Sequence, residues 1–440
     1  MRQLISLLVI GACFITGIAP AHAQGEKAIL RLLDRAGKDT TSITDGNTIQ
    51  LNIKLPTPAQ AATEAAFYLE GIAEPVAGCS IAAGAQACAS ASIATSGWHW
   101  DAGGAAQPER GIQARVGGQE SGALMVNIRP RPVVMVHGFI SNWETWQPYL
   151  GAQGYLASIG LQGFAVGDGQ VPGVLNTGKI DQPEGRTNSI AQNAEILGQY
   201  IAGVQQKTGA EKVDLLVHSM GGMISRYYID RVMKNDSVAQ VIFLGTPMSG
   251  SACVYPVASL GFLMPASLEI QPDYMVNIFN QQIIHRRGIA FHMVAGTRLI
   301  EQITSPCSAA PSDTVVAFES ATSIPLDDVQ KIALIHGDLT TDRAVFDDAV
   351  RHLLQAPPGA FSPRPDPPVP TANYIPEQFS RAYTGHIDPG GEATVTIHID
   401  PNVGLANFSL YDTSRSLEVE VRGASGKVIE LSAEKNGLIK

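Results

Sequence analysis

A single serine stands between an apolar run and a pair of glycines near the middle of the chain. The run VDLLV, residues 213–217, leads directly into HSMGG, residues 218–222, and a helical pattern follows over residues 223–233. A strand, a serine, glycines and a helix form the layout of a nucleophile elbow, in which a tight turn exposes the serine hydroxyl above a sheet. Gly221 fits that turn because the backbone reverses there and leaves no space for a side chain. The pattern predicts Ser219 as a nucleophile, and an ordinary turn capped by a serine is the alternative.

These residues resemble the elbow of the bacterial lipase and esterase branch of the α/β-hydrolases, which usually reads GHSMGG. Val217 stands here in place of the first glycine, a position at which related lipases tolerate alanine. The resemblance covers residues 131–354, about half the chain. It implies an α/β-hydrolase fold and an acyl-enzyme formed on Ser219.

The family's oxyanion motif has a counterpart in HGF, residues 137–139, directly after the apolar run VVMV, residues 133–136. By the resemblance, the backbone N–H groups of Phe139 and Met220 are the two donors. Such donors stabilise the negative charge that a tetrahedral intermediate places on the former carbonyl oxygen, and losing one costs about 10²–10³ in rate. His137 itself is expected to be structural rather than a base.

The acid and the base of the resemblance lie downstream. The segment SDTVV, residues 312–316, resembles the family's acid loop, usually Asp-Gly-x-Val, with Thr314 replacing the glycine. His336 follows the apolar run KIALI, residues 331–335, where the family places its histidine, and the order Ser, Asp, His is that of α/β-hydrolases. His336 would take the proton from Ser219 and return it to the leaving alcohol, while Asp313 would hold its tautomer. Three other carboxylates compete for the acid role: Asp327, Asp328 and Asp338. The other downstream histidines are expected at the surface or in the core: His285, His292 and His352.

Two further segments resemble parts of the family that surround the site. The loop LGTP, residues 244–247, is similar to the family's loop after the following strand, with Met248 in place of a frequent histidine. Residues 251–286 stand where the family carries a lid, and their large apolar side chains are Leu260, Phe262, Leu263, Met264, Met275 and Phe279. An apolar lid would suit acyl chains, and plain core packing is an equally weighted alternative.

A calcium site occurs in some related lipases, and Asp338 follows His336 by two residues, as one of their ligands does. One carboxylate does not make a calcium site, which needs six to eight oxygen ligands. The sequence therefore assigns no metal ion and no cofactor.

The elements that must position these residues begin at Arg131. Apolar runs of strand length occupy residues 133–136, 164–166, 213–217, 241–244, 291–295 and 331–335. Between the second and third, apolar residues recur at helical spacing: Ile190, Ala194, Leu197, Ile201 and Val204. Asn188 is the expected N-cap of that helix, and Ala191 in the third helical position excludes a capping box. Continuous apolar strands that alternate with helices predict a mostly parallel sheet buried on both faces.

Two β modules are expected to flank this catalytic domain, residues 131–355. Alternating short strands over residues 24–130 predict an all-β sandwich that resembles bacterial immunoglobulin-like modules. A proline-rich stretch predicts an extended linker over residues 356–374, and alternating patterns within residues 375–440 predict a second β domain, expected to be truncated. Trp98 and Trp100 would share one face of a strand, either as a binding platform or, more often, in a core or domain interface.

An export signal is predicted at the N-terminus, over residues 1–23. Arg2, an apolar stretch over residues 4–18 and the cleavage pattern AHA before Gln24 form the usual three parts. A membrane anchor is the alternative, but the stretch is short for a span of about 20 residues and Pro20 follows it. The protein is therefore expected to be secreted, outside the cell or in the periplasm, with no transmembrane segment.

Disulfides are expected in an exported chain. The cysteines that follow the signal are Cys79, Cys88, Cys253 and Cys307. Their even number suggests two bridges, and pairing Cys79 with Cys88 and Cys253 with Cys307 keeps each bridge within one predicted domain. Buried free thiols are the alternative, and zinc is disfavoured because the chain has no paired C-x-x-C spacing.

Composition narrows the functions that remain. Hydrophobic residues make up 45% of the chain, charged residues 16%, and the net charge is −10 without a long Lys/Arg run, which disfavours nucleic acid as a partner. The sequence predicts a secreted serine hydrolase of carboxylic esters, a lipase or esterase, acting on an ester substrate that lies in a lipid or polymer surface. A polyester depolymerase and an acyltransferase share the same triad and stay open. A non-catalytic adhesion protein is disfavoured because the triad and oxyanion motifs occur together.

Overall fold

The computed structural model describes residues 27–298, 311–366, 387–398, 408–409, 417–429 and 438–439. The predicted export signal and Cys307 lie outside these residues. Within the described chain, no helix is both long and apolar enough to cross a membrane.

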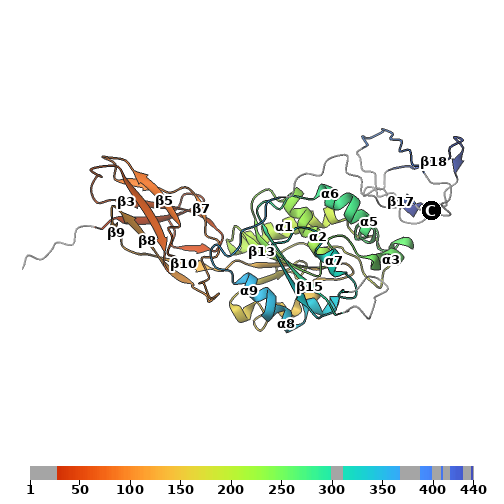
Figure 1. Ribbon diagram of the computed structural model, residues 1–440, viewed down its shortest axis with the longest axis horizontal. Coiled ribbons are helices and arrows are strands. Elements are labelled where there is room, and N and C mark those ends of the chain that lie inside the picture. The colour runs from red at the N-terminus through yellow and green to blue at the C-terminus, as the bar shows by residue number, and fades with distance from the viewer. Residues whose placement is uncertain are drawn as a thin grey trace, which may run out of the picture.

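A parallel sheet of six strands forms the centre of the molecule, with helices on both faces (Figure 1). In spatial order the strands are β12 (Gly163–Ala165), β11 (Val133–Val136), β13 (Val213–His218), β14 (Val238–Leu244), β15 (Ala290–Gly296) and β16 (Asp328–Ile332). Each neighbouring pair is parallel. The predicted parallel sheet is confirmed, and its carboxyl ends, where loops of a parallel sheet build sites, lie together at one edge.

Alternate residues of the inner strands enter two different hydrophobic clusters, one on each face. In β11, Val134 and Val136 join the cluster under helix α1, whereas Val133 and Met135 join the cluster on the opposite face. This two-sided burial explains why these strands read as unbroken apolar runs. Strand β16 is an edge strand that ends at Ile332, so the predicted strand over residues 331–335 was placed too late along the chain.

Helix α1 (Ile190–Thr208) covers one face of the sheet and buries all five of its predicted apolar positions. Its N-cap is Ser189 rather than the predicted Asn188, and a capping box does form. The Ser189 hydroxyl accepts from the Gln192 N–H at 3.1 Å, and the Gln192 side chain accepts from the Ser189 N–H at 3.0 Å. The prediction was wrong by one residue, which moved the third helical position from Ala191 to a glutamine.

The remaining helices are short. On the side of α1 lie α2 (Met220–Tyr227), the π-helical turn η3 (Tyr228–Val232) and the helices between β14 and β15. Those helices are η4 (Ala252–Val254), α3 (Tyr255–Ser259), α4 (Ala266–Glu269), α5 (Pro272–Tyr274), η5 (Met275–Phe279) and α6 (Asn280–Gln282). The opposite face is covered mainly by η1 (Trp143–Tyr149), η2 (Ala157–Ile159), η6 (His336–Thr340), α8 (Arg343–Val345), η7 (Phe346–Val350) and α9 (Arg351–Leu354). Helix α7 (Phe318–Ala321) precedes β16.

Two β-sheets precede the central unit and pack around one hydrophobic cluster. The first contains β1 (Ile29–Asp34), β3 (Thr48–Lys54), β6 (Ala87–Ala89) and β7 (Ile93–Ala94). The second contains β2 (Ser42–Thr44), β4 (Thr63–Leu69), β5 (Ala77–Ile81), β8 (Glu109–Val116), β9 (Gln119–Glu120) and β10 (Leu124–Arg129). A disulfide between Cys79 of β5 and Cys88 of β6 joins the two sheets, as predicted. Cys253 is also disulfide-bonded, and its predicted partner, Cys307, lies outside the described residues.

The two sheets are fixed to the central unit by buried contacts. Trp98 is 3% exposed and packs in the cluster between the two sheets, while Trp100 is 2% exposed and packs in a cluster of the central unit. The platform interpretation of this pair is therefore wrong, and the interface interpretation holds. The Arg131 guanidinium adds an ion pair to each side, with Asp45 at 2.8 Å and Asp214 at 3.1 Å.

The first part of the predicted linker packs against the central unit instead of leaving it. The Phe361 ring lies 4.3 Å from the His292 ring, centroid to centroid. The Arg364 N–H donates to Asp327 at 2.8 Å, and Asp366 accepts from the Arg286 N–H at 2.5 Å. Residues 356–366 therefore belong structurally to the central unit, because polar and aromatic contacts hold them there.

The C-terminal residues that the structure describes form two short strand pairs. Strand β17 (Phe408–Ser409) pairs with β20 (Leu438–Ile439), and β18 (Val421–Arg422) pairs with β19 (Val428–Ile429). Residues 393–398, which alternate in sequence as a strand would, are exposed and lie in no strand. The C-terminal β domain stays a prediction.

Candidate active site

Ser219 occupies a strained turn between β13 and α2. Its φ of 53° and ψ of −128° lie outside the regions that most side chains allow, and its N–H is fixed by the Leu244 carbonyl at 3.0 Å. A Cβ on Gly221 would lie 2.5 Å from the Val136 carbonyl oxygen, and one on Gly222 would overlap the Thr246 hydroxyl. The predicted requirement for glycine at position 221 is confirmed, and the turn has the geometry of a nucleophile elbow.

Asp313 and His336 meet across the loops that follow β15 and β16. The His336 Nδ1–H donates to Asp313 Oδ2 at 2.7 Å, and the His336 backbone N–H donates to the Asp313 carbonyl at 2.7 Å. The other carboxylate oxygen, Oδ1, accepts from the N–H groups of Val315 at 3.0 Å and Val316 at 2.6 Å. The carboxylate is buried and fixed on both oxygens, and the bond to Nδ1 leaves Nε2 of His336 as the nitrogen with a lone pair.

Thr314 stands where the resembled family carries a glycine, and its backbone is left-handed. Its φ is 85°, in the left-handed region that a threonine rarely adopts. Two glycines make room for the acid beside it. A Cβ on Gly245 would lie 2.8 Å from Asp313 Oδ2 and 3.2 Å from His336 Nδ1, and a Cβ on Gly296 would lie 2.6 Å from Asp313 Cβ. Asp313 therefore lies in a space that both glycines leave open.

His218 links the elbow to the base. Its Nε2–H donates to the His336 carbonyl at 3.0 Å, and the two imidazole rings lie 4.5 Å apart. Burial holds the pKa of His218 well below its ordinary value, so the ring is neutral at pH 7. Among the described residues, no hydrogen bond joins the Ser219 hydroxyl to His336, a bond that often tightens only when substrate binds.

The two predicted oxyanion donors border the same turn. Gly138 lies so close to Ser219 that a Cβ there would be 2.6 Å from Ser219 Cβ and 3.2 Å from its hydroxyl oxygen. The next N–H along the chain is that of Phe139, and the structure shows no partner for it among the described residues. Met220 supplies the first N–H of helix α2, which has no acceptor within the helix. Both N–H groups remain available to an anion.

The competing acids and histidines serve other contacts. Asp327 pairs with Arg286, and its pKa falls because the Phe291 and Arg364 N–H groups and this arginine outweigh the opposing effect of burial. Asp328 begins β16, and Asp338 is exposed. His285 contacts Asp230, His292 is buried in β15, and His352 is exposed.

Burial lowers the pKa of His137 to about 4, so this histidine is neutral and structural, as expected. The described chain contains no group of three His, Cys, Asp or Glu side chains that could hold a metal ion.

The predicted lid segment is mostly packed. Leu263, Met264, Met275 and Phe279 are buried, whereas Leu260 is 63% exposed. Arg226 of α2 fixes the end of the segment by donating to the Asn280 side chain at 2.9 Å and to the Ile283 carbonyl at 2.9 Å. Core packing therefore accounts for four of these side chains.

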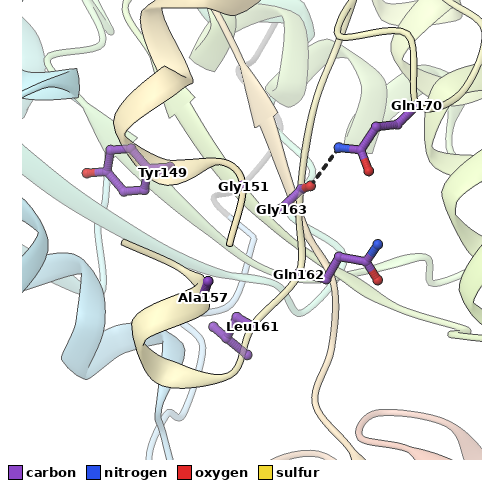
Figure 2. Close-up of a pocket in the computed structure, with 7 residues that line it drawn as sticks. All are labelled: Tyr149, Gly151, Ala157, Leu161, Gln162, Gly163 and Gln170. Carbon is purple, nitrogen blue, oxygen red and sulfur yellow. Dashed lines mark hydrogen bonds between the residues drawn. The ribbon is translucent and has the colours of Figure 1, made fainter. Parts of the chain in front are cut away.

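A cavity of about 380 Å³ lies away from these residues (Figure 2). Its lining includes Tyr149, Gln162, Gly163 and Gln170, and the Gln170 amide donates to the Gly163 carbonyl at 2.9 Å. Gly163 begins β12, and it pairs with the first residue of β11. The cavity is therefore at the amino end of these parallel strands, opposite the end that carries Ser219.

Sequence reasoning did not find Thr177. This buried residue lies in the loop between β12 and α1, and its hydroxyl donates to the Gly138 carbonyl at 2.8 Å. No motif surrounds it, and a lone threonine in a loop carries no signal that could have identified it. His218 was present in the elbow pattern, but its contact with His336 depends on the fold.

Comparison with known proteins supports the fold of this region. Residues 131–290 match a family model described as alpha/beta hydrolase fold. Over 132 residues the chain is 34% identical to a triacylglycerol lipase of Pseudarthrobacter phenanthrenivorans, covering 27% of this chain and 34% of that protein. It is also 34% identical over 132 residues to a triacylglycerol lipase of Burkholderia plantarii, covering 27% and 30%. The chain thus spans about a third of the length of these relatives. The crystal structure of the mature Bacillus licheniformis lipase BlEst2 is 19% identical, with a TM-score of 0.40, and covers 51% of this chain and 91% of that one.

Proposed function

We propose that this protein, whose residues 131–290 have the α/β-hydrolase fold, is a serine hydrolase of carboxylic esters with the triad Ser219, His336 and Asp313. The observation that carries the proposal is the 2.7 Å bond from His336 Nδ1 to Asp313, formed beside a serine in a strained elbow. A carboxylate held on both oxygens, a base with its second nitrogen available and a serine on a strained turn are the parts that acyl transfer requires.

The reaction follows from these positions. His336 Nε2 accepts the Ser219 proton as the hydroxyl oxygen attacks the ester carbonyl carbon. The carbonyl oxygen becomes an anion, which the N–H groups of Phe139 and Met220 stabilise. His336 then gives the proton to the alkoxide as the C–O bond breaks, and the alcohol leaves. Water, deprotonated by His336, then attacks the acyl carbon, and His336 returns the proton to the Ser219 oxygen as the acyl C–O bond breaks and the acid leaves. Asp313 stabilises the imidazolium in both steps.

We favour a lipid ester as the substrate class. The matched relatives are named triacylglycerol lipases. Polyester depolymerisation and acyl transfer use the same triad, so substrate range decides among them. A panel of short esters, triglyceride emulsions and polyester films, each assayed with and without an acceptor alcohol, separates these activities.

The nucleophile is tested by Ser219→Ala. Removing the oxygen that forms the acyl-enzyme should reduce kcat by about 10⁶-fold. The unfolding temperature should stay the same or rise slightly, because the turn keeps its backbone hydrogen bonds without the hydroxyl. The exposed Ser158 provides a control, since Ser158→Ala should leave hydrolysis unchanged. Retention of more than a few per cent of activity by Ser219→Ala would exclude Ser219 as the nucleophile.

The flanking regions extend the proposal. We propose that the N-terminal pair of sheets is an immunoglobulin-like module, on the basis of its two sheets packed around one core. Secretion after cleavage at residue 23 is consistent with the disulfide between Cys79 and Cys88, since such bonds persist in oxidising compartments. N-terminal sequencing of the exported protein tests the cleavage site.

A further inference from the structure

Thr177 binds the backbone on both sides of Phe139. Its hydroxyl donates to the Gly138 carbonyl, the one that precedes Phe139, at 2.8 Å. Its own carbonyl accepts from the Ile140 N–H, the one that follows, at 3.1 Å. Thr177, from a loop far away in the chain, therefore fixes the peptide groups on both sides of Phe139. The first of them contains the proposed oxyanion donor.

The first of these bonds determines where the Phe139 N–H points. The Gly138 carbonyl and the Phe139 N–H belong to one planar trans peptide, so they point in opposite directions. Because the carbonyl is turned toward Thr177, the N–H is turned away from it. The His137 Nδ1–H also donates to this carbonyl, at 3.1 Å. The same nitrogen lies 3.5 Å from the Thr177 hydroxyl oxygen.

The second bond stabilises a backbone conformation that is otherwise unfavourable. Ile140 has a φ of 54°, in the left-handed region that a β-branched residue rarely occupies. Such a conformation is strained and persists only where the surroundings enforce it. The Ile140 N–H bond to Thr177 supplies part of that enforcement, and Thr177 is itself almost completely buried.

We propose that Thr177 is a positioning residue of the oxyanion hole, acting through the Gly138–Phe139 peptide to aim the Phe139 N–H at the developing charge. This inference rests on the proposed function. Without the hydroxyl, the Gly138 carbonyl keeps one donor, and the peptide gains freedom to rotate. The cost appears in the transition state, where the carbonyl oxygen carries its full charge, rather than in the binding of the neutral ester.

The test compares Thr177→Val, which keeps the shape and removes the hydroxyl, with Thr177→Ser, which keeps the hydroxyl. We expect Thr177→Val to lower kcat by about 10–100-fold, less than the loss of a whole donor, with KM within about threefold of the original. Thr177→Ser should recover most of kcat. Binding of an alkyl boronic acid, which forms a tetrahedral adduct with the nucleophile, should weaken by a similar factor in Thr177→Val alone.

Thr95 provides a matched control. It is a buried threonine directly after β7 whose hydroxyl also donates to a backbone carbonyl, that of Asn47, at 3.0 Å. Thr95→Val should reduce the unfolding temperature without changing kcat. Equal losses of kcat in Thr95→Val and Thr177→Val, or an unchanged kcat in Thr177→Val, would overturn the inference while leaving the proposed function intact.

A structural readout separates the two failures. If the unmodified protein hydrolyses no ester, the proposed function fails. If it does hydrolyse esters, the crystal structure of Thr177→Val decides the positioning role. A Gly138–Phe139 peptide that rotates or becomes disordered in that variant supports the role. An unchanged peptide with a folded Thr177→Val chain refutes it.

Discussion

At the scale of single residues, Asp313 shows how the site fixes a proton. One carboxylate oxygen, Oδ1, accepts two backbone N–H groups, and the other, Oδ2, accepts from His336. The acid therefore cannot rotate without losing bonds on both sides. This arrangement sets which nitrogen of His336 carries the hydrogen.

Asp313→Asn should move the hydrogen of His336 from Nδ1 to Nε2. The amide oxygen will take the position that accepts the two backbone N–H groups, which leaves the amide NH₂ facing His336 Nδ1. His336 must then carry its hydrogen on Nε2, where it cannot accept the proton of Ser219. We expect kcat to fall by about 10⁴-fold with little change in KM.

Ester hydrolysis at pH 7 checks this prediction, with the thermal unfolding of each variant measured in parallel. The exposed Asp338 provides the control, since Asp338→Asn should keep full activity. A loss of less than tenfold in Asp313→Asn would show that another group orients His336.

Motifs in the sequence identified the types and order of these residues but not their support. Ser219, Asp313 and His336 stand in recognisable segments because each needs a particular local turn. Thr177 has no such requirement, and its role arises only because two loops far apart in the chain meet. Thr314 was predicted as a departure from the family's glycine, and the fold nonetheless imposes the glycine-like conformation on it.

At the scale of elements, the segment between β14 and β15 depends on one buried cation. Arg226 of α2 donates to the Asn280 side chain and the Ile283 carbonyl, and its guanidinium lies 5.0 Å from the centre of the Phe279 ring. Burial lowers the pKa of Arg226 to about 10, which still leaves it charged at pH 7. Helix α2 and the segment between β14 and β15 are therefore joined by polar bonds as well as apolar packing.

Arg226→Met should remove the polar bonds between α2 and this segment. Methionine keeps most of the apolar contact with Phe279 but leaves the Asn280 and Ile283 oxygens without their charged donor. Since a hydrogen bond to a charged group contributes about 1.5–3 kcal/mol, we expect a loss of about 3 kcal/mol in the free energy of unfolding. Urea unfolding measures this loss.

The control is Arg351, an exposed arginine of α9 that donates to the Gln355 side chain at 3.0 Å. Arg351→Met should change the free energy of unfolding by less than about 0.5 kcal/mol, as is usual for a surface change. Equal effects of the two substitutions would mean that Arg226 adds nothing beyond its apolar packing.

Elements were predicted where their periodicity was strong and misplaced where their ends depend on tertiary contacts. The strands at residues 133–136 and 213–217 are nearly as expected because burial on both faces makes them wholly apolar. Strand β16 is an edge strand, half exposed, so its apolar signal was weak and its end was misplaced. The start of α1 was misplaced by one residue because both Asn188 and Ser189 can cap a helix.

At the scale of the whole molecule, buried neutral histidines connect stability to pH. Burial lowers the pKa of His137 to about 4 and also lowers the pKa of His292. In the described structure, both ring nitrogens of His292 lack a hydrogen-bond partner. In the unfolded chain each ring takes up a proton near pH 6.5. Between pH 6.5 and the lowered value the unfolded state binds more protons, so stability falls as pH falls.

We expect the free energy of unfolding to be greatest above pH 6.5 and to decrease below it by up to about 1.4 kcal/mol per pH unit for each such histidine. His292→Leu removes one titrating group while keeping an apolar side chain beside Phe361, so its stability should decline less steeply. Urea unfolding from pH 8 to pH 5 gives the slopes. The exposed His352 is the control, and a His292→Leu slope equal to that of His352→Gln would contradict the prediction.

The last prediction concerns where the catalytic unit ends. The sequence places its boundary at residue 355, but three contacts lie beyond that point, made by Phe361, Arg364 and Asp366. They fix β15 and the Asp327–Arg286 pair rather than the triad.

A chain ending after residue 366 should therefore match the full chain in turnover on a soluble ester and in unfolding temperature, because the proline-rich stretch beyond it is expected to transmit few contacts. A chain ending after residue 355 should retain its turnover at low temperature but unfold several degrees earlier, because a loss of 1 kcal/mol shifts the midpoint by about 2–4 °C in a domain of this size. Comparing the three chains by soluble-ester turnover and calorimetry is sufficient. If the two truncations unfold at the same temperature, residues 356–366 add no stability, and if the longer one loses turnover, the C-terminal region helps to build the site.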